Sequence, residues 1–527
     1  MGWIEDAERL RRMNADTAVS GDTSRRALRL FAIFAAEIVA LNILWLPVSL
    51  DFLHFAFCDN GANLTVQFLI SRGYLPTIDF GYHYGLMPLL IGKLWFGLFG
   101  RSPLAYQALM LACGLLIAGA LARVAAHLRF GALGLALMVI ALGFAVRVSY
   151  PVMAQAVEAV LLSSALAEQA AGRRARALGF ACAAVFAKPS MGFVYGALLS
   201  ALGVIDAYRT NRGLSGLIRF AIPAAATGAT LAVVLGALYG PAALVETVSP
   251  LGGAANYRAL HFGFFSGAGR EFWNPSGLSW VYYLLGVAGF WLSASVFLIG
   301  CGIAAMIHWT AAPSTPDVAA HRRNEIILTC AAVHIAFVVL MFGNRWSWIY
   351  YSYFLVAGAA AAADFSPWRR RISLVLCVLA ILSCTGDIYS FHRSWQVRQP
   401  DAITAQLWST AEERDEWTAV LGEARGRRAA ILDTKGAAEL MFPEFEAPVS
   451  SCLEPAWMNA AEIQRKAAQI SGADLVVVPI GIDWCSGIPP APEIRAAMSS
   501  FAPTFSGRHF VIYRRTIPPA GLPSDSQ

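Results

Sequence analysis

The feature that most constrains the fold is a series of long apolar runs separated by short polar segments. A helix needs about 20 consecutive apolar residues to cross a bilayer. With 57% hydrophobic and only 14% charged residues, the chain is predicted to be a multi-span membrane protein. Runs of the required length lie near residues 28–50, 103–127, 131–150, 151–170, 216–238, 278–307, 325–343, 350–366 and 371–390.

A further apolar stretch, residues 176–206, is too long for one crossing and is interrupted by Lys188-Pro189-Ser190. Proline removes a backbone donor and lysine resists burial, so two short helices are predicted to meet here near the membrane surface. The total is then about eleven crossings.

Clusters of arginine give the expected orientation, because positively charged loops stay in the cytoplasm. With the break at Lys188, the clusters fall on one side together with the N-terminus, which is therefore predicted to be cytoplasmic. Loops 51–102 and 239–277 and the C-terminus are predicted to be extracytoplasmic. The clusters include Arg25, Arg26, Arg123, Arg129, Arg173, Arg174, Arg176, Arg209, Arg212, Arg219, Arg322, Arg323, Arg369, Arg370 and Arg371.

A change in composition near residue 391 divides the chain into domains. The prediction is a cytoplasmic segment 1–27, an all-α polytopic membrane domain 28–390, an extracytoplasmic α/β domain 391–517 and a flexible tail 518–527. In the α/β domain, strands are expected at 429–433, 474–479 and 509–514, and helices at 403–425 and 459–471. Its two cysteines, Cys452 and Cys485, are equally compatible with a disulfide and with free thiols.

The first long loop carries acids beside the membrane. Asp59 follows the first span and Asp79 lies farther along the loop. Carboxylates at this depth are costly unless they have partners or a function, so both are candidate site residues. The alternative for Asp59 is a helix N-cap before 62–72, with Gly61 providing the turn, and the alternative for Asp79 is a turn after Pro76.

The loop resembles that of the GT-C superfamily of integral membrane glycosyltransferases, in particular the protein O-mannosyltransferase and aminoarabinose lipid A transferase group. The resemblance rests on Asp59, Gly73-Tyr74-Leu75-Pro76, Asp79-Phe80-Gly81-Tyr82 and Leu98-Phe99-Gly100-Arg101-Ser102. It implies that Asp59 is the catalytic base. The implied reaction moves a sugar from a polyprenyl-phosphate donor to an extracytoplasmic glycan, lipid or protein of the cell envelope. Asn60 stands where many relatives have a second acid, so a divalent metal is left open and no metal ligand is assigned.

Several cations and aromatic residues are candidates for the rest of the site. Lys188 is the expected contact of the donor phosphate, with Arg270 and Arg345 as further candidates. Tyr82, His83 and Asp79 are expected to support the site or bind the acceptor. The alternatives are packing at the membrane interface for the aromatic residues and His83, and contacts with lipid headgroups for the cations.

Two other classes of function remain open at this point: a lipid or polysaccharide transporter or flippase, and a non-catalytic envelope-assembly protein. The chain has neither G-x-x-x-x-G-K-[ST] nor a strand-linked G-x-G-x-x-G, which argues against a nucleotide-driven activity. The net charge of +6 lies in clusters that flank apolar runs, so nucleic-acid binding is not expected. Localisation in a cell membrane, which is the inner membrane if the cell is Gram-negative, follows from the same interpretation.

Overall fold

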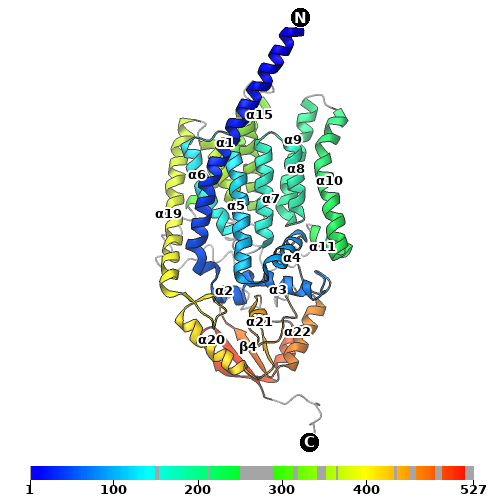
Figure 1. Cartoon of the computed structure of the whole chain (residues 1–527), viewed down its shortest axis with the longest axis vertical. Coiled ribbons are helices and arrows are strands. Elements are labelled where there is room, and N and C mark those ends of the chain that lie inside the picture. The colour runs from blue at the N-terminus through cyan, green and yellow to red at the C-terminus, as the bar shows by residue number, and fades with distance from the viewer. Residues whose placement is uncertain are drawn as a thin grey trace.

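A bundle of long helices carries a small α/β domain at one end, and the N-terminal end of the chain lies at the other (Figure 1). This computed structural model describes residues 2–82, 84–148, 153–209, 213–249, 289–311, 318–340, 352–363, 366–432, 436–451, 458–480 and 490–516. The predicted fold class, a helical membrane domain with a C-terminal α/β domain, is confirmed.

Each segment predicted to cross the membrane contains a described helix. By length and composition, five stretches can span a bilayer: Asp22–Ser49, Pro103–His127, Pro189–Arg209, Gly213–Tyr239 and Phe290–Ile307. The full crossing number stays a prediction. The helices of the bundle are α1 (Gly2–Ser49), α5 (Pro103–His127), α6 (Ala132–Val148), α7 (Met153–Ala170), α8 (Arg174–Val185), α9 (Pro189–Arg209), α10 (Gly213–Tyr239), α15 (Gly289–Ala311), α16 (Val318–Leu340), α18 (Ser352–Ala363) and α19 (Pro367–Val397).

The break predicted at Lys188 is confirmed, because α8 ends at Val185 and α9 begins at Pro189. Pro189 at the first position of α9 has no N–H to leave unpaired, which is why it starts a helix well. The last helix of the bundle is longer than expected, since α19 continues to Val397 and contains the boundary predicted at residue 391.

Arginines tie the helices together at the bundle end away from the α/β domain. Arg26 donates to the carbonyl of Phe130 at 2.5 Å, and Arg323 donates to that of Leu128 at 2.7 Å. These bonds satisfy carbonyls that a helix end leaves without partners. Several predicted clusters are thus gathered at one end of the molecule. The side of the membrane on which this end lies stays a prediction.

At the opposite end, short helices lie between the bundle and the α/β domain: α2 (Phe52–Phe57), α3 (Asp59–Ser71), α4 (Met87–Phe99) and α11 (Pro241–Val248). Helix α3 starts at Asp59 rather than at residue 62, so the expected role of Gly61 as a turn is wrong. A Cβ at Gly61 would lie 1.9 Å from the carbonyl oxygen of Phe55 and 2.7 Å from the backbone nitrogen of Ala437. Glycine is needed there because two backbones approach the helix closely.

The α/β domain contains a four-stranded sheet in the order β3-β4-β6-β5. Strand β3 pairs in parallel with β4, and the other pairs are antiparallel. The predicted strands correspond to β3 (Ala429–Ile431), β4 (Leu475–Pro479) and β6 (Phe510–Arg515), whereas β5 (Phe501–Ser506) was not predicted. Two short strands and four helices complete the described part of the domain: β1 (Gln399–Pro400), β2 (Trp408–Ser409), α20 (Ala411–Ala424), α21 (Ala438–Met441), α22 (Ala460–Gly472) and α23 (Pro492–Met498).

An aromatic cluster joins the α/β domain to the bundle. The buried ring of Trp417 on α20 lies 5.3 Å from that of Phe52 and 5.5 Å from that of Phe57, both on α2. Phe510 of β6 contacts the same Trp417 ring at 5.1 Å. Large buried aromatic contacts of this kind dominate the energy of an interface. The α/β domain is therefore packed firmly onto the first loop.

Candidate functional site

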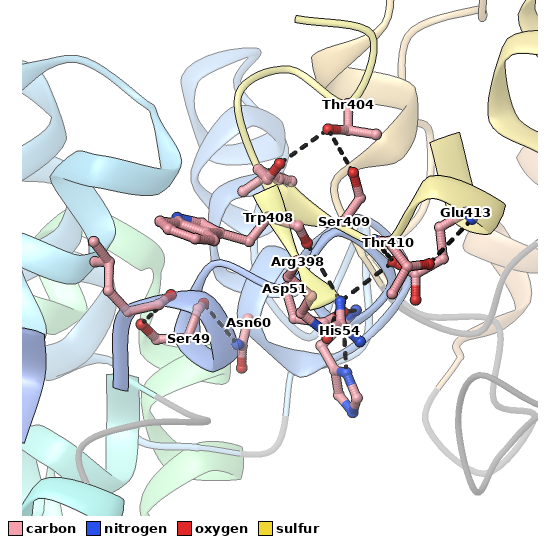
Figure 2. Close-up of polar contacts among 12 residues, drawn as sticks. Ser49, Asp51, His54, Asn60, Arg398, Thr404, Trp408, Ser409, Thr410 and Glu413 are labelled. Atoms are coloured by element: carbon pink, nitrogen blue, oxygen red, sulfur yellow. Dashed lines mark hydrogen bonds and ion pairs between the residues drawn. The ribbon is translucent and has the colours of Figure 1, made fainter. Parts of the chain in front are cut away.

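The first acid of the loop, Asp51, anchors the loop to the α/β domain (Figure 2). It caps α2 by accepting the backbone N–H of His54, and its carboxylate lies 2.5 Å from Arg398. Arg398 also reaches Glu413 of α20 at 3.3 Å. Burial opposes ionisation of Asp51, but the hydrogen bond and charge of His54 and the charge of Arg398 prevail and lower its pKa. Asp51 therefore has a structural role.

Asp59 is the first residue of α3, and Cys58 occupies the N-cap position. The N-terminus of a helix favours a carboxylate electrostatically. Its neighbour Asn60 is buried and donates to the carbonyl of Ser49 at 3.4 Å, which connects the start of α3 to the end of α1. The side chain of Asp59 is not among those described, so its role as the base stays a prediction.

Asp79 closes a turn in the loop. Its carboxylate accepts the backbone N–H of Leu75 at 2.7 Å, and its own N–H donates to the carbonyl of Leu75 at 2.8 Å. Thr77, inside the turn, has φ of 65°, a conformation that the surrounding bonds must hold. The geometry is that of the turn alternative, and a further role in binding the acceptor stays a prediction.

Helix α22 of the α/β domain holds the same turn from outside. The carboxylate of Glu462 accepts the N–H of Gly81 at 2.9 Å, and the amide of Asn459 donates to the carbonyl of Ile78 at 3.0 Å. Arg465 donates to the carbonyl of Asp79 and lies 4.8 Å from the ring centre of Tyr74. Burial raises the pKa of Glu462, although its hydrogen bonds act in the opposite direction. The turn is thus fixed by the α/β domain.

The end of the loop pairs with the turn before Lys188. The N–H of Gly85 donates to the carbonyl of Ala187 at 3.0 Å, and that of Met87 donates to the carbonyl of Phe186 at 2.9 Å. A Cβ at Gly85 would lie only 2.0 Å from the oxygen of Phe186, so this approach requires glycine. The backbone at Lys188 is therefore joined to the loop that carries Asp59 and Asp79.

Glu158 is a further candidate site residue that the sequence interpretation did not name. It lies on α7, is 1% exposed and interacts electrostatically with Lys188. The buried Tyr353 of α18 is also within electrostatic range of it. A carboxylate buried within a predicted span is costly and therefore a functional signal. The signal was available in the sequence, because the apolar run 151–170 contains two acids, Glu158 near its middle and Glu168 near its end.

Aromatic residues line the same region. The rings of Tyr82 and Tyr84 are 5.9 Å apart, and Tyr82 packs in an apolar cluster with Leu86, Phe186 and Tyr239. Burial, with a smaller contribution from Tyr239, raises the pKa of Tyr82, so its hydroxyl stays protonated and can donate. His83, Arg270, Arg345, Cys452 and Cys485 lie outside the described residues.

The described residues around Lys188 suit an anionic group. Among the described residues, no group of three or more His, Cys, Asp or Glu could hold a metal. Lys188 lies at a helix break, near the buried carboxylate of Glu158, and can hold a phosphate. The neighbouring loop carries acids, and one of these can take a proton.

Comparisons with known proteins show a likeness of fold to a solved structure. No family model matches the sequence, and no curated protein matches it significantly. The structure is similar to the crystal structure of ArnT from Cupriavidus metallidurans bound to undecaprenyl phosphate, with a TM-score of 0.47 and 13% sequence identity. The likeness covers 92% of this chain and 98% of that one. A likeness of fold at this sequence identity and TM-score does not establish the activity of this chain.

Proposed function

We propose that this chain is a membrane glycosyltransferase that moves a sugar from a polyprenyl-phosphate donor to an extracytoplasmic glycan, lipid or protein acceptor. The observation that carries the proposal is the backbone pairing of Gly85 and Met87 with Ala187 and Phe186. It joins the cation best suited to a phosphate, Lys188, to the loop with the candidate base. A reaction of this type needs these two groups close together.

Each group has a role in the proposed reaction. Asp59 takes the proton from the acceptor hydroxyl as the bond to the sugar forms, so that the hydroxyl becomes a better nucleophile. Lys188 stabilises the charge that develops on the phosphate as it leaves, and Glu158 orients the lysine. Arg270 and Arg345 are further candidates for the phosphate.

The acceptor side of the proposed site is the tethered turn of the loop. Tyr82 and His83 offer hydrogen-bond donors to a sugar or acceptor hydroxyl. Asp79 supports them by closing the turn that α22 holds in place. A firmly held loop is what positioning requires, because misplacing reacting groups slows a reaction steeply.

Substitution of the proposed base tests this function. Asp59→Asn keeps the size and hydrogen bonding of the side chain but cannot accept the proton, so turnover should fall ~10²–10⁴-fold. The assay follows covalent product from a polyprenyl-phosphate sugar with purified protein. Asp401→Asn is the matched control, because Asp401 lies at the domain junction, where its carboxylate accepts the N–H of Ile403 and lies 3.5 Å from Arg414, outside the proposed site. It should retain wild-type turnover.

Two results would contradict the proposal. Near-normal turnover of Asp59→Asn would remove this residue as the base. Movement of a lipid-linked sugar across the membrane by wild type, without any covalent product, would favour a transporter instead.

A further inference from the structure

A large charged cavity lies at the end of the bundle away from the α/β domain. It measures about 1210 Å³ and is formed where the first turns of α8, α10 and α16 meet the last turns of α9. In Figure 1 this region is at the upper ends of α8, α9 and α10. It is far along the bundle from the loop that carries Asp59. Five arginines line it: Arg173, Arg174, Arg176, Arg219 and Arg322.

Acidic residues neutralise only part of this charge. Arg174 lies 2.6 Å from Glu325 and 3.5 Å from Asp206, and Arg173 lies 2.6 Å from Glu168. In the part of the chain that the structure describes, the other three arginines form no ion pair. The walls of the cavity therefore carry an excess of positive charge.

The backbone makes room for one of the unpaired arginines. Gly172, in the turn between α7 and α8, has φ of +79°, and a Cβ there would lie 2.8 Å from a terminal nitrogen of Arg322. A side chain at this position would push the guanidinium away. Glycine at this position therefore allows the positive φ of the turn and also leaves room for the guanidinium of Arg322 at the wall of the cavity.

Part of the cavity lining is apolar and includes Phe220 of α10. Phe220 of α10 packs directly on Gly203 of α9, where a Cβ would lie 2.5 Å from the ring. The same end of α10 exposes Leu214, Ile218 and Ile222 to 73%, 54% and 56%. Apolar side chains exposed on a helix that can span the membrane face lipid. One of the helices that line the cavity, α10, therefore also meets the bilayer.

We propose that this cavity binds the phosphate headgroup of an anionic membrane phospholipid. Guanidinium groups bind phosphate oxygens through pairs of hydrogen bonds, and basic pockets between membrane helices suit such headgroups. Arg176, Arg219 and Arg322 hold the phosphate, while Glu325 and Asp206 keep Arg174 in place beneath it. The apolar wall at Phe220 accepts the first part of the acyl chains. Arginines that served only to orient the chain in the membrane would need neither the cavity nor the space that Gly172 leaves for Arg322.

The test is lipid binding by purified, delipidated protein, measured by native mass spectrometry. Wild type should prefer phosphatidylglycerol to phosphatidylcholine. The triple variant Arg176→Gln/Arg219→Gln/Arg322→Gln should bind phosphatidylglycerol about 100-fold more weakly, from about fivefold per arginine. The matched control, Arg129→Gln/Arg370→Gln/Arg371→Gln, removes the same charge from arginines that do not line the cavity, and should keep the affinity of wild type.

Three outcomes would overturn the proposal. The first is an equal loss of phosphatidylglycerol affinity in the control variant, which would mean that the lipid binds through the general positive charge of the surface. The second is that the wild-type protein binds inorganic phosphate but does not prefer phosphatidylglycerol to phosphatidylcholine, which would mean that the cavity binds a soluble ligand. The third concerns a single variant, which is included in case the triple variant misfolds. Arg219 is exposed on α10, so Arg219→Gln alone should fold normally and bind phosphatidylglycerol about fivefold more weakly. Unchanged affinity of that single variant would also contradict the proposal.

Discussion

Replacing Gly85 with alanine tests whether the pairing of the loop with the Lys188 turn matters. The new Cβ would lie 2.0 Å from the carbonyl oxygen of Phe186, and real contacts are at least 3.0 Å. The two segments must therefore separate by about 1 Å. That movement breaks the hydrogen bonds from Gly85 to Ala187 and from Met87 to Phe186, which are now 3.0 and 2.9 Å long.

The cost follows from those two bonds. Each buried donor or acceptor left without a partner costs about 1–3 kcal/mol, so the variant should lose roughly 2–5 kcal/mol of stability. Displacing a catalytic group by about 1 Å can slow a reaction ~10²-fold. We therefore expect a lower Tm and a fall in kcat/KM for the polyprenyl-phosphate sugar that exceeds what the loss of folded protein explains.

Gly97→Ala is the matched control. Gly97 lies on α4, close along the chain, and a Cβ there has no neighbour within 4 Å. Alanine should keep activity and raise stability by about 0.5–1 kcal/mol, since glycine is a poor helix former. Gly85→Ala with the Tm and kcat/KM of wild type would refute the reasoning, and so would equal damage from Gly97→Ala.

Three further substitutions test other parts of the account. Lys188→Ala should weaken binding of a polyprenyl-phosphate analogue and slow turnover together, with partial rescue in Lys188→Arg; unchanged affinity and rate would make the lysine structural. The lowered pKa of Asp51 means that its contacts with His54 and Arg398 stabilise the fold above the usual pKa of 3.8, and that this stabilisation is lost as pH falls through the lower folded value. Asp51→Asn should therefore lower Tm at pH 7, and the difference from wild type should shrink in acid; a constant difference would contradict this. Lys466→Met should destabilise the protein by about 3–5 kcal/mol in thermal unfolding, because Glu439, 2.5 Å away, is left as a buried charge, and a neutral result would show that the pair contributes little.

The helices of the bundle were predictable because hydropathy over about 20 residues is a strong local signal. The break at Lys188-Pro189 was predictable for the same reason, since a proline and a lysine interrupt one apolar run. Strand β5 was not, because Pro503 and a shift of register near Phe505 disturb the alternating pattern of an edge strand.

The contacts that organise the site depend on residues far apart in sequence. Glu462 and Gly81 are separated by 381 positions, and no local pattern indicates that one holds the other. Glu158 was overlooked for a different reason, since the run 151–170 stays strongly apolar on average even with Glu158 and Glu168 in it. Gly61 and Gly85 show the same limit, because a glycine required by the close approach of another backbone cannot be distinguished in sequence from one in a turn.

The most direct test of the central claim is the position of a bound donor phosphate. A structure of the purified protein with polyprenyl phosphate, determined by electron cryo-microscopy, should show the phosphate within hydrogen-bond distance of Lys188, on the side of the loop that carries Asp59. Density for the phosphate elsewhere on the protein, with Lys188 still turned toward Glu158, would contradict the account.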